Sequence, residues 1–229
     1  MRRYWLGLMV VFMAWAALRV AAATTTTEQV APPASAAAAA LEQLPGILER
    51  PHPGGYDRSC KAGDGCVFGT AWTDDVDVTD GHNGCSTRDD VLRRDLTAAE
   101  TKTGTRGCVV VAGALHDPYT GQILQFAKAR AGDVNIDHIL PLAAAWDLGA
   151  WRWTPRQRQN FANDPLNLLA VQATVNLSKG DRTPGEWTPS TASGRCLYAE
   201  RYVAVAVAYR LPVTPADRAA LAVDLHPCT

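Results

Sequence analysis

The sequence predicts a single α+β domain that is held together by disulfide bonds. Three observations lead to this prediction. Short β-branched runs bounded by turn residues alternate with segments whose apolar residues recur at helical spacing. Six cysteines occur in the chain of 229 residues. The N-terminal stretch is typical of a signal peptide, and the length that remains suits one compact domain.

Residues 1–23 are interpreted as a signal peptide, which predicts a secreted, extracellular protein. A pair of arginines precedes an apolar run, and small residues suit cleavage just before Thr24. The alternative is an uncleaved membrane anchor, because the run has the ~20 residues that a bilayer crossing needs. Arg19 interrupts that run and disfavours the anchor. The arginine pair leaves the export route open, and no stable membrane association is expected after cleavage.

Residues 24–50 are predicted to form a low-complexity leader, and residues 51–229 the folded domain. The leader is rich in Thr, Ala and Pro, a composition typical of flexible segments. Only the part from Ala37 to Leu44 suits a brief helix. We expect the leader to contribute nothing to the core.

The six cysteines all follow the predicted signal peptide. Their even number in an exported chain favours disulfides. Zinc is the competing interpretation, and the lack of any C-x2-C pair disfavours it. Many connectivities are open to six cysteines, and proximity along the chain favours Cys60–Cys66, Cys85–Cys108 and Cys196–Cys228.

The elements follow in order after a turn-rich region. A helix is predicted to begin at Asp89-Asp90 and to continue through apolar positions as far as Ala99. A hairpin is predicted to pair Cys108–Leu115 with Gln122–Phe126 across the turn Asp117–Gly121. Further strands are expected over Ile136–Leu140 and Asn167–Val171, and helices over Leu142–Ala150, Pro155–Ala162, Gln172–Ser178, Arg195–Tyr209 and Pro215–Leu225.

Net charge offers no general attraction for nucleic acid. The full chain carries −1, and without the signal peptide it holds 19 basic and 23 acidic residues, or about −4. Residues 41–123 hold 8 basic and 13 acidic side chains, whereas residues 124–229 hold 11 and 9. Any attraction for phosphate must therefore be local, and the C-terminal half favours it.

One stretch, residues 136–181, contains the groups that phosphodiester hydrolysis requires. Water attack needs a base, positive charge near the reacting phosphate, and ligands that leave a metal open to substrate. His138 can be the base, and Asp137 and Asn176 can be metal ligands. A carboxylate and an amide oxygen are hard ligands, which favours Mg²⁺ or Mn²⁺.

The spacing of these residues makes two geometric demands. Neighbours in a regular strand point to opposite faces, so we expect a bend or bulge where Asp137 and His138 serve one site. Asn176 and Lys179 are three apart and share a helical face, so Lys179 can approach the same phosphate. Alternatively, Lys179 is only a solvated cation at the helix end.

The motifs resemble those of HNH (ββα-metal) endonucleases. The resemblance rests on three motifs: Asp137-His138-Ile139 with Pro141, Asn167-Leu168-Leu169, and Asn176-x-x-Lys179-Gly180-Asp181. The chain is similar to the HNH domain of RNA-guided CRISPR nucleases and, from about Tyr56 to Cys228, to secreted actinobacterial HNH proteins related to the DUF1524 group.

The resemblance implies a ββα-metal core around one divalent cation, within the α+β domain and its additional helices. It implies Asp137 and Asn176 as ligands, His138 as general base, and Asn167 as the residue that holds the base-bearing loop by backbone hydrogen bonds. The third letter of the motif is Asn176 instead of His. Several family branches have that Asn, so the resemblance implies that metal binding survives the change.

Other conspicuous residues have simpler interpretations. The remaining histidines are expected to be structural, and Arg88, Arg93 and Arg94 to form local ion pairs. Core or stapling positions are expected for Trp146, Trp151, Trp153 and Trp187. The acidic segment Asp74–Asp90 lacks the spacing of a calcium loop and is interpreted as a solvated loop.

The sequence therefore predicts a secreted, monomeric, metal-dependent endonuclease that acts on DNA, with RNA as an alternative substrate, at low sequence specificity. The competing hypothesis is a non-catalytic extracellular module that binds a cation or a partner on the same scaffold. A third is a toxin or restriction-like nuclease acting inside cells, which the signal peptide and cysteines disfavour.

Overall fold

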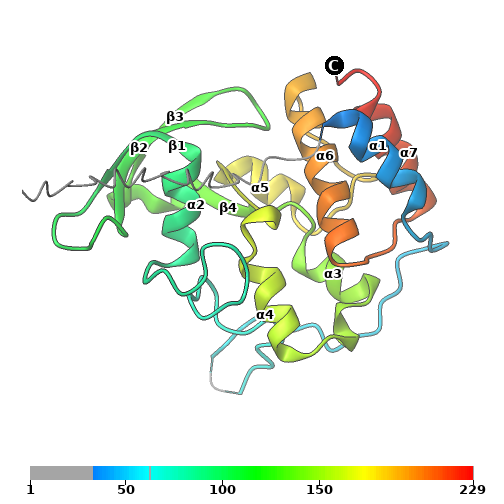
Figure 1. The fold of residues 1–229 in the computed structure, drawn as a ribbon, viewed down its shortest axis with the longest axis horizontal. Helices are drawn as coiled ribbons and strands as arrows, with labels where there is room; N and C mark the ends of the chain where they lie inside the picture. Colours follow the sequence, from blue (N-terminus) through cyan, green and yellow to red (C-terminus); the bar gives the residue numbers. More distant parts are fainter. Residues whose placement is uncertain (1–32, 62, 229) are drawn as a thin grey trace, which may run out of the picture.

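A computed structural model describes residues 33–61 and 63–228 (Figure 1). The predicted signal peptide lies outside these residues. The elements of regular structure are α1 (Ala34–Gln43), α2 (Thr87–Asp95), β1 (Leu96–Thr101), β2 (Val110–His116), β3 (Ile123–Ala127), β4 (Val134–His138), α3 (Leu142–Leu148), α4 (Pro155–Asn163), β5 (Leu168–Gln172), α5 (Ala173–Lys179), α6 (Ala192–Ala208) and α7 (Pro215–Leu225), with short 3-10 turns before β4, after α3 and before β5.

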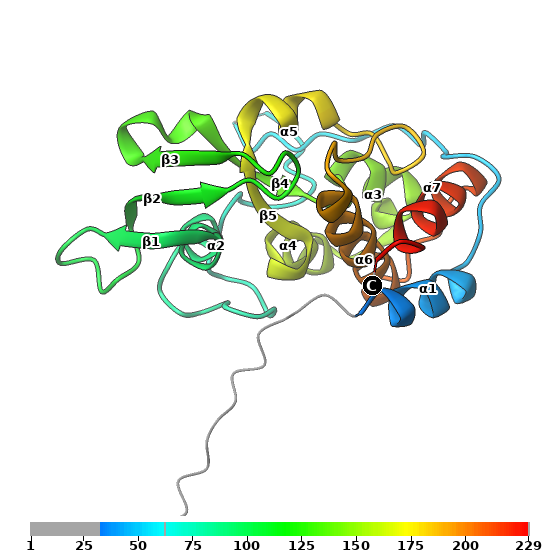
Figure 2. The same ribbon diagram turned by 90° about the horizontal axis from the view of Figure 1, so that it is seen from above.

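The strands form two antiparallel sheets. β1, β2 and β3 make a three-stranded sheet, and β4 and β5 make a separate pair (Figure 2). The predicted hairpin is confirmed as β2 and β3. Its turn is stabilised by the side chain of Asp117, which accepts hydrogen bonds from the backbone N–H groups of Tyr119 and Thr120 at 3.0 and 2.8 Å.

β4, β5 and α5 form a hairpin followed by a helix. The pairing of β4 with β5 is unbroken from Val134–Gln172 to His138–Leu168, so of the expected bend or bulge the bulge is wrong. The chain instead bends over residues 139–140, directly after the strand. α5 ends at Gly180, whose φ of 59° suits a residue without a side chain. The mixed α+β fold with an HNH-like ββα unit is as predicted.

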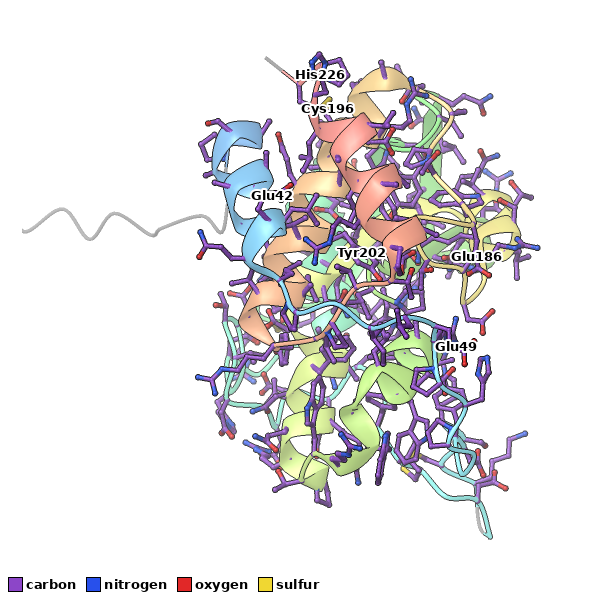
Figure 3. All side chains as sticks on the ribbon, turned by 90° about the vertical axis from the view of Figure 1, so that its right-hand side faces the viewer. Glu42, Glu49, Glu186, Cys196, Tyr202 and His226 are labelled. Carbon is purple, nitrogen blue, oxygen red and sulfur yellow. A yellow bond between two sulfur atoms is a disulfide. The ribbon has the colours of Figure 1, made fainter. Side chains whose placement is uncertain are left out.

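The first described segment belongs to the core, contrary to expectation. α1 packs against α6 and α7 (Figure 3). Its side chains Ala37 and Leu41 are 0% and 1% exposed. The guanidinium of Arg218 in α7 also donates to the carbonyl of Leu44 at 2.7 Å. The prediction that the leader builds no core is therefore wrong for residues 34–44.

The predicted helix at Asp89 is shorter than expected. α2 begins at Thr87, after the N-cap Ser86, and ends at Asp95. Residues 96–101 continue as β1, with Leu96 opposite Leu115 of β2. The helical interpretation of Ala99 is therefore wrong, because pairing with β2 determines the conformation of this segment.

The three predicted disulfides are confirmed. Cys60–Cys66 closes a loop before α2, Cys85–Cys108 links the start of α2 to β2, and Cys196–Cys228 joins α6 to the end of the chain. Every cysteine is paired, and all of them lie among the described residues. Of the described helices, none combines the length and the apolar character needed to cross a membrane.

Candidate functional site

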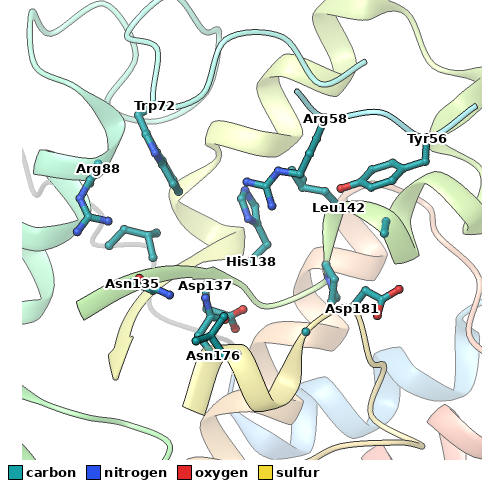
Figure 4. A pocket seen from close by; sticks show the side chains of 15 residues that line it. Tyr56, Arg58, Trp72, Arg88, Asn135, Asp137, His138, Leu142, Asn176 and Asp181 are labelled. Carbon is teal, nitrogen blue, oxygen red and sulfur yellow. The ribbon is translucent and has the colours of Figure 1, made fainter. Parts of the chain in front are cut away.

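A cavity of about 610 Å³ opens where β4 and α5 meet the loop segment Tyr56–Trp72 (Figure 4). Asp137 and His138 reach it from β4, and Asn176 reaches it from α5. The sequence-predicted base and both predicted metal ligands therefore line one pocket. Residues 141–143 at the start of α3 form a further part of the wall.

His138 has a defined tautomer. Its Nε2 lies 2.9 Å from the carbonyl oxygen of Ala162, and a carbonyl can only accept, so Nε2 carries the hydrogen. Nδ1 is left as the basic nitrogen. The ring also stacks on Trp72, with 5.9 Å between centroids and 18° between planes. These two contacts fix the orientation of the imidazole.

The environment of His138 keeps the imidazole neutral. Burial lowers its pKa to about 3, and the positive charges of Arg58 and Lys179 act in the same direction. The hydrogen bond to Ala162 opposes this shift. A neutral imidazole can accept a proton from water, which is what a general base requires.

Asn167 holds the loop that follows His138. Its side-chain oxygen accepts a hydrogen bond from the backbone N–H of Leu140 at 2.8 Å, and its amide nitrogen donates to the carbonyl of Leu140 at 3.2 Å. Its own carbonyl accepts from Ile139 N–H at 2.8 Å. Asn167 is fully buried. This is a positioning arrangement, because the side chain bonds backbone groups and does not line the pocket.

Asp137 lies at the floor of the pocket in a network of buried polar groups. Its Oδ2 accepts a hydrogen bond from the hydroxyl of Tyr119 at 2.7 Å, and its Oδ1 accepts one from Nζ of Lys179 at 2.8 Å. The residue is 3% exposed. Burial raises the pKa of its carboxyl group, and Lys179 and Tyr119 oppose that rise. The hairpin turn that holds Tyr119 thus also supports the candidate site.

Lys179 lies beneath the pocket and not at its surface. Its side chain is 0% exposed, and Nζ donates both to Asp137 and to the carbonyl of His138 at 2.7 Å. Lys179 does share a helical face with Asn176, as the spacing predicted. The expected contact with phosphate is not available to it, because its ammonium group is enclosed by these two partners.

Asn176 supplies a free amide at the pocket wall. It lines the cavity next to Asp137 (Figure 4), and no described residue forms a hydrogen bond with its side chain. A carboxylate and an amide oxygen that line one cavity fit the preferences of Mg²⁺ or Mn²⁺. Within the described residues no cluster of three or more His, Cys, Asp or Glu side chains could hold a metal, so water or substrate oxygens would complete the shell.

The lining also contains residues without a functional role in the predictions from sequence, among them two aromatic and two basic side chains. Tyr56, Arg58 and Trp72 come from the loops before α2, and Arg88 comes from α2 itself. For Arg58 the only signal is a positive charge beside a cysteine loop, which is too common a pattern to identify a site.

Comparison with known proteins places the chain in a family. Residues 86–223 match the family of GmrSD restriction endonucleases, C-terminal domain. An uncharacterized secreted protein of the fungus Arthroderma benhamiae is 41% identical over 146 residues, which cover 63% of this chain and 68% of the relative. No solved structure matches.

The relative and the disulfides can be compared with two predictions, the extracellular location and the likeness to an actinobacterial branch. The relative is described as secreted, and the three disulfides suit an oxidising compartment, which agrees with the predicted extracellular location. The relative is fungal, so the likeness to an actinobacterial branch stays a prediction. The chain belongs to the family of the GmrSD restriction endonuclease C-terminal domain, which is HNH-like.

Proposed function

We propose that this protein is a secreted endonuclease that hydrolyses phosphodiester bonds in DNA, with His138 as the general base and one Mg²⁺ or Mn²⁺ held by Asp137 and Asn176. The observation that carries the proposal is the geometry of His138. Its Nε2–H donates to the carbonyl of Ala162, which leaves Nδ1 to accept a proton in the pocket that Asp137 and Asn176 also line.

Each residue of the candidate site has a defined role in this proposal. Nδ1 of His138 takes a proton from water as the water oxygen attacks phosphorus. Asn167 keeps the loop after His138 in place through its bonds to Leu140. Asp137 and Asn176 orient a hard cation, which when bound would neutralise phosphate charge and stabilise the leaving oxygen. Lys179 holds the carboxylate of Asp137 in position from below.

The test is cleavage of plasmid DNA by the purified mature protein with Mg²⁺ or Mn²⁺, with and without EDTA, repeated on RNA. His138→Ala is expected to abolish cleavage and to leave the circular dichroism spectrum unchanged. His226→Ala, at an exposed position outside the pocket, is the matched control and is expected to cut normally. Cleavage by His138→Ala at the rate of the unmutated protein would remove this residue from the mechanism.

The cation site has its own test. Asn176→Ala removes the amide from the pocket wall without opening the core, since the side chain is only half-buried and has no described hydrogen-bond partner. Manganese titration is expected to show weaker binding in this variant. Unchanged affinity would exclude Asn176 as a ligand.

One observation favours the alternative of a non-catalytic module. Both carboxylate oxygens of Asp137 already accept hydrogen bonds, and one of these bonds comes from the ammonium group of Lys179. A site of this kind binds a metal more weakly than an unpaired carboxylate does. The plasmid assay separates the two functions, because a binding module leaves DNA intact under every metal condition.

A further inference from the structure

The loop segment Tyr56–Trp72 forms the pocket wall that faces β4 and α5. It contributes Tyr56, Arg58 and Trp72 to the lining (Figure 4). Arg58 and His138 also line a second, smaller cavity together with Trp72. The whole segment precedes the residues matched by the family, 86–223. The wall therefore comes from residues outside that match.

The described residues next to Arg58 are bonded to the opposite side of their loop. The Cys60–Cys66 disulfide closes it. The side chain of Asp57 accepts hydrogen bonds from the backbone N–H groups of Ser59 and Gly65, at 3.0 and 2.9 Å. Two backbone bonds of 2.9 Å, Cys66 to Ser59 and Val67 to Asp57, cross the same loop. These bonds fix the backbone on both sides of Arg58, which reduces the entropy that residues 57–59 lose when a ligand binds there.

The charge of Arg58 is not matched by a neighbouring carboxylate. No described acidic group lies within ion-pair distance of its guanidinium. By contrast Arg88, the other arginine of the lining, donates to the carbonyls of Ala131 and Val134. The one acidic residue of the lining besides Asp137 is Asp181, which pairs with Arg50 at 3.2 Å.

We propose that Arg58 binds a non-bridging phosphate oxygen of the nucleic-acid backbone and thereby positions the scissile phosphate over His138. This inference rests on the proposed function and deepens it. A guanidinium is the side chain best suited to two parallel hydrogen bonds with a phosphate. Arg58 is exposed and lines the pocket beside His138 (Figure 4). It supplies the cationic contact that the enclosed Lys179 cannot make.

Binding is measured first, in a background that cannot cut. Fluorescence anisotropy of a short labelled DNA duplex is recorded with His138→Ala protein and Mn²⁺, and repeated in EDTA. Introducing Arg58→Gln into the His138→Ala protein is expected to weaken binding of the duplex about tenfold or more, the loss typical of one charge-assisted contact. It is also expected to lower the slope of log affinity against log salt by about one.

Two further variants make the result specific. Arg58→Lys keeps the charge but loses the paired hydrogen bonds, and is expected to restore the salt slope while recovering only part of the affinity. Arg210→Gln removes an equal charge from an exposed position that does not line this pocket, and is expected to leave affinity and slope unchanged. The proposal would be overturned if Arg58→Gln changed neither the affinity for DNA nor the slope of log affinity against log salt.

Cleavage by otherwise unmutated protein distinguishes this inference from the proposed function. If the Arg58→Gln protein cuts DNA as well as the unmutated protein does, the proposed function stands and the role of Arg58 is refuted. If the unmutated protein does not cut DNA, but its binding of DNA depends on Arg58, the proposed function is refuted and the phosphate contact is supported. Loss of both binding and cleavage in Arg58→Gln, with Arg210→Gln intact, supports both.

Discussion

Replacing Lys179 with methionine is expected to cost about 3–5 kcal/mol of the free energy of unfolding, the loss typical of breaking a buried ion pair. Its Nζ lies 2.8 Å from Oδ1 of Asp137, and the two residues are 0% and 3% exposed. At this distance an effective dielectric constant of about 20 gives an attraction of roughly 6 kcal/mol, which offsets the desolvation of both ions. Without Lys179 the carboxylate keeps only the hydroxyl of Tyr119 as a partner.

A double variant separates the charge from the loss of packing. Asp137→Asn combined with Lys179→Met removes both charges, so the buried site no longer contains an unpaired ion. We expect the double variant to be more stable than Lys179→Met alone, although it carries one more substitution. Lys128→Met, at an exposed position, is the control for a change from lysine to methionine and is expected to have little effect.

The assay is unfolding by urea followed by tryptophan fluorescence, which gives the free energy of unfolding of each variant. Two results would refute the reasoning. One is a loss below about 1 kcal/mol in Lys179→Met, as for an exposed pair. The other is a double variant that is as unstable as Lys179→Met or more so, because the cost would then come from packing and not from the lone charge.

Three further predictions follow from the same structure. His138 is expected to show no imidazole titration by NMR near pH 6.5, and because the unfolded chain binds that proton, stability is expected to fall as pH drops from 6.5 toward 3. Asn167→Ala leaves both backbone groups of Leu140 without partners and is expected to cost about 2–4 kcal/mol in urea unfolding. Leu41→Ala is expected to cost about 2–4 kcal/mol in the same assay, whereas exposed Glu42→Ala is expected to cost little.

The central part of the fold could be predicted from the sequence because its signals are local. The turn Asp117–Gly121 lies between two β-branched runs, and Gly180 ends a short amphipathic helix. Threonine with proline just after it marks the start of α7 at Thr214-Pro215. Cysteine proximity was sufficient for the disulfides, since each pair consists of two cysteines that follow one another along the chain.

The wrong predictions concern segments whose structure depends on distant partners. Leu96 fits both a helix and a strand, and its pairing with Leu115 decides between them. The alanine-rich stretch around Ala37 has little variety, yet small side chains allow α1 to approach α6 and α7 closely. Composition alone does not show whether such a helix has a surface to pack against.

The sequence predicted some of the side chains that meet in the pocket, but not how deeply each of them is buried. The motifs bring Asp137, His138 and Asn176 to one pocket, as their spacing suggested. Spacing does not specify depth, however, and Lys179 reaches Asp137 from the protein side while Asn176 faces the cavity. Arg58 could not be found in advance, because its place in the wall depends on how a disulfide-closed loop folds over β4.

The enclosed lysine also limits how the proposed cation site can work. With the charge of Asp137 matched by Lys179, the protein presents a nearly neutral pair of oxygen donors, Asp137 and Asn176, and such a pair holds a divalent ion weakly. A bound phosphodiester adds both negative charge and further oxygen ligands. Cation and substrate are therefore expected to strengthen each other's binding, so manganese affinity measured with a bound, uncleaved DNA is expected to exceed that of the protein alone.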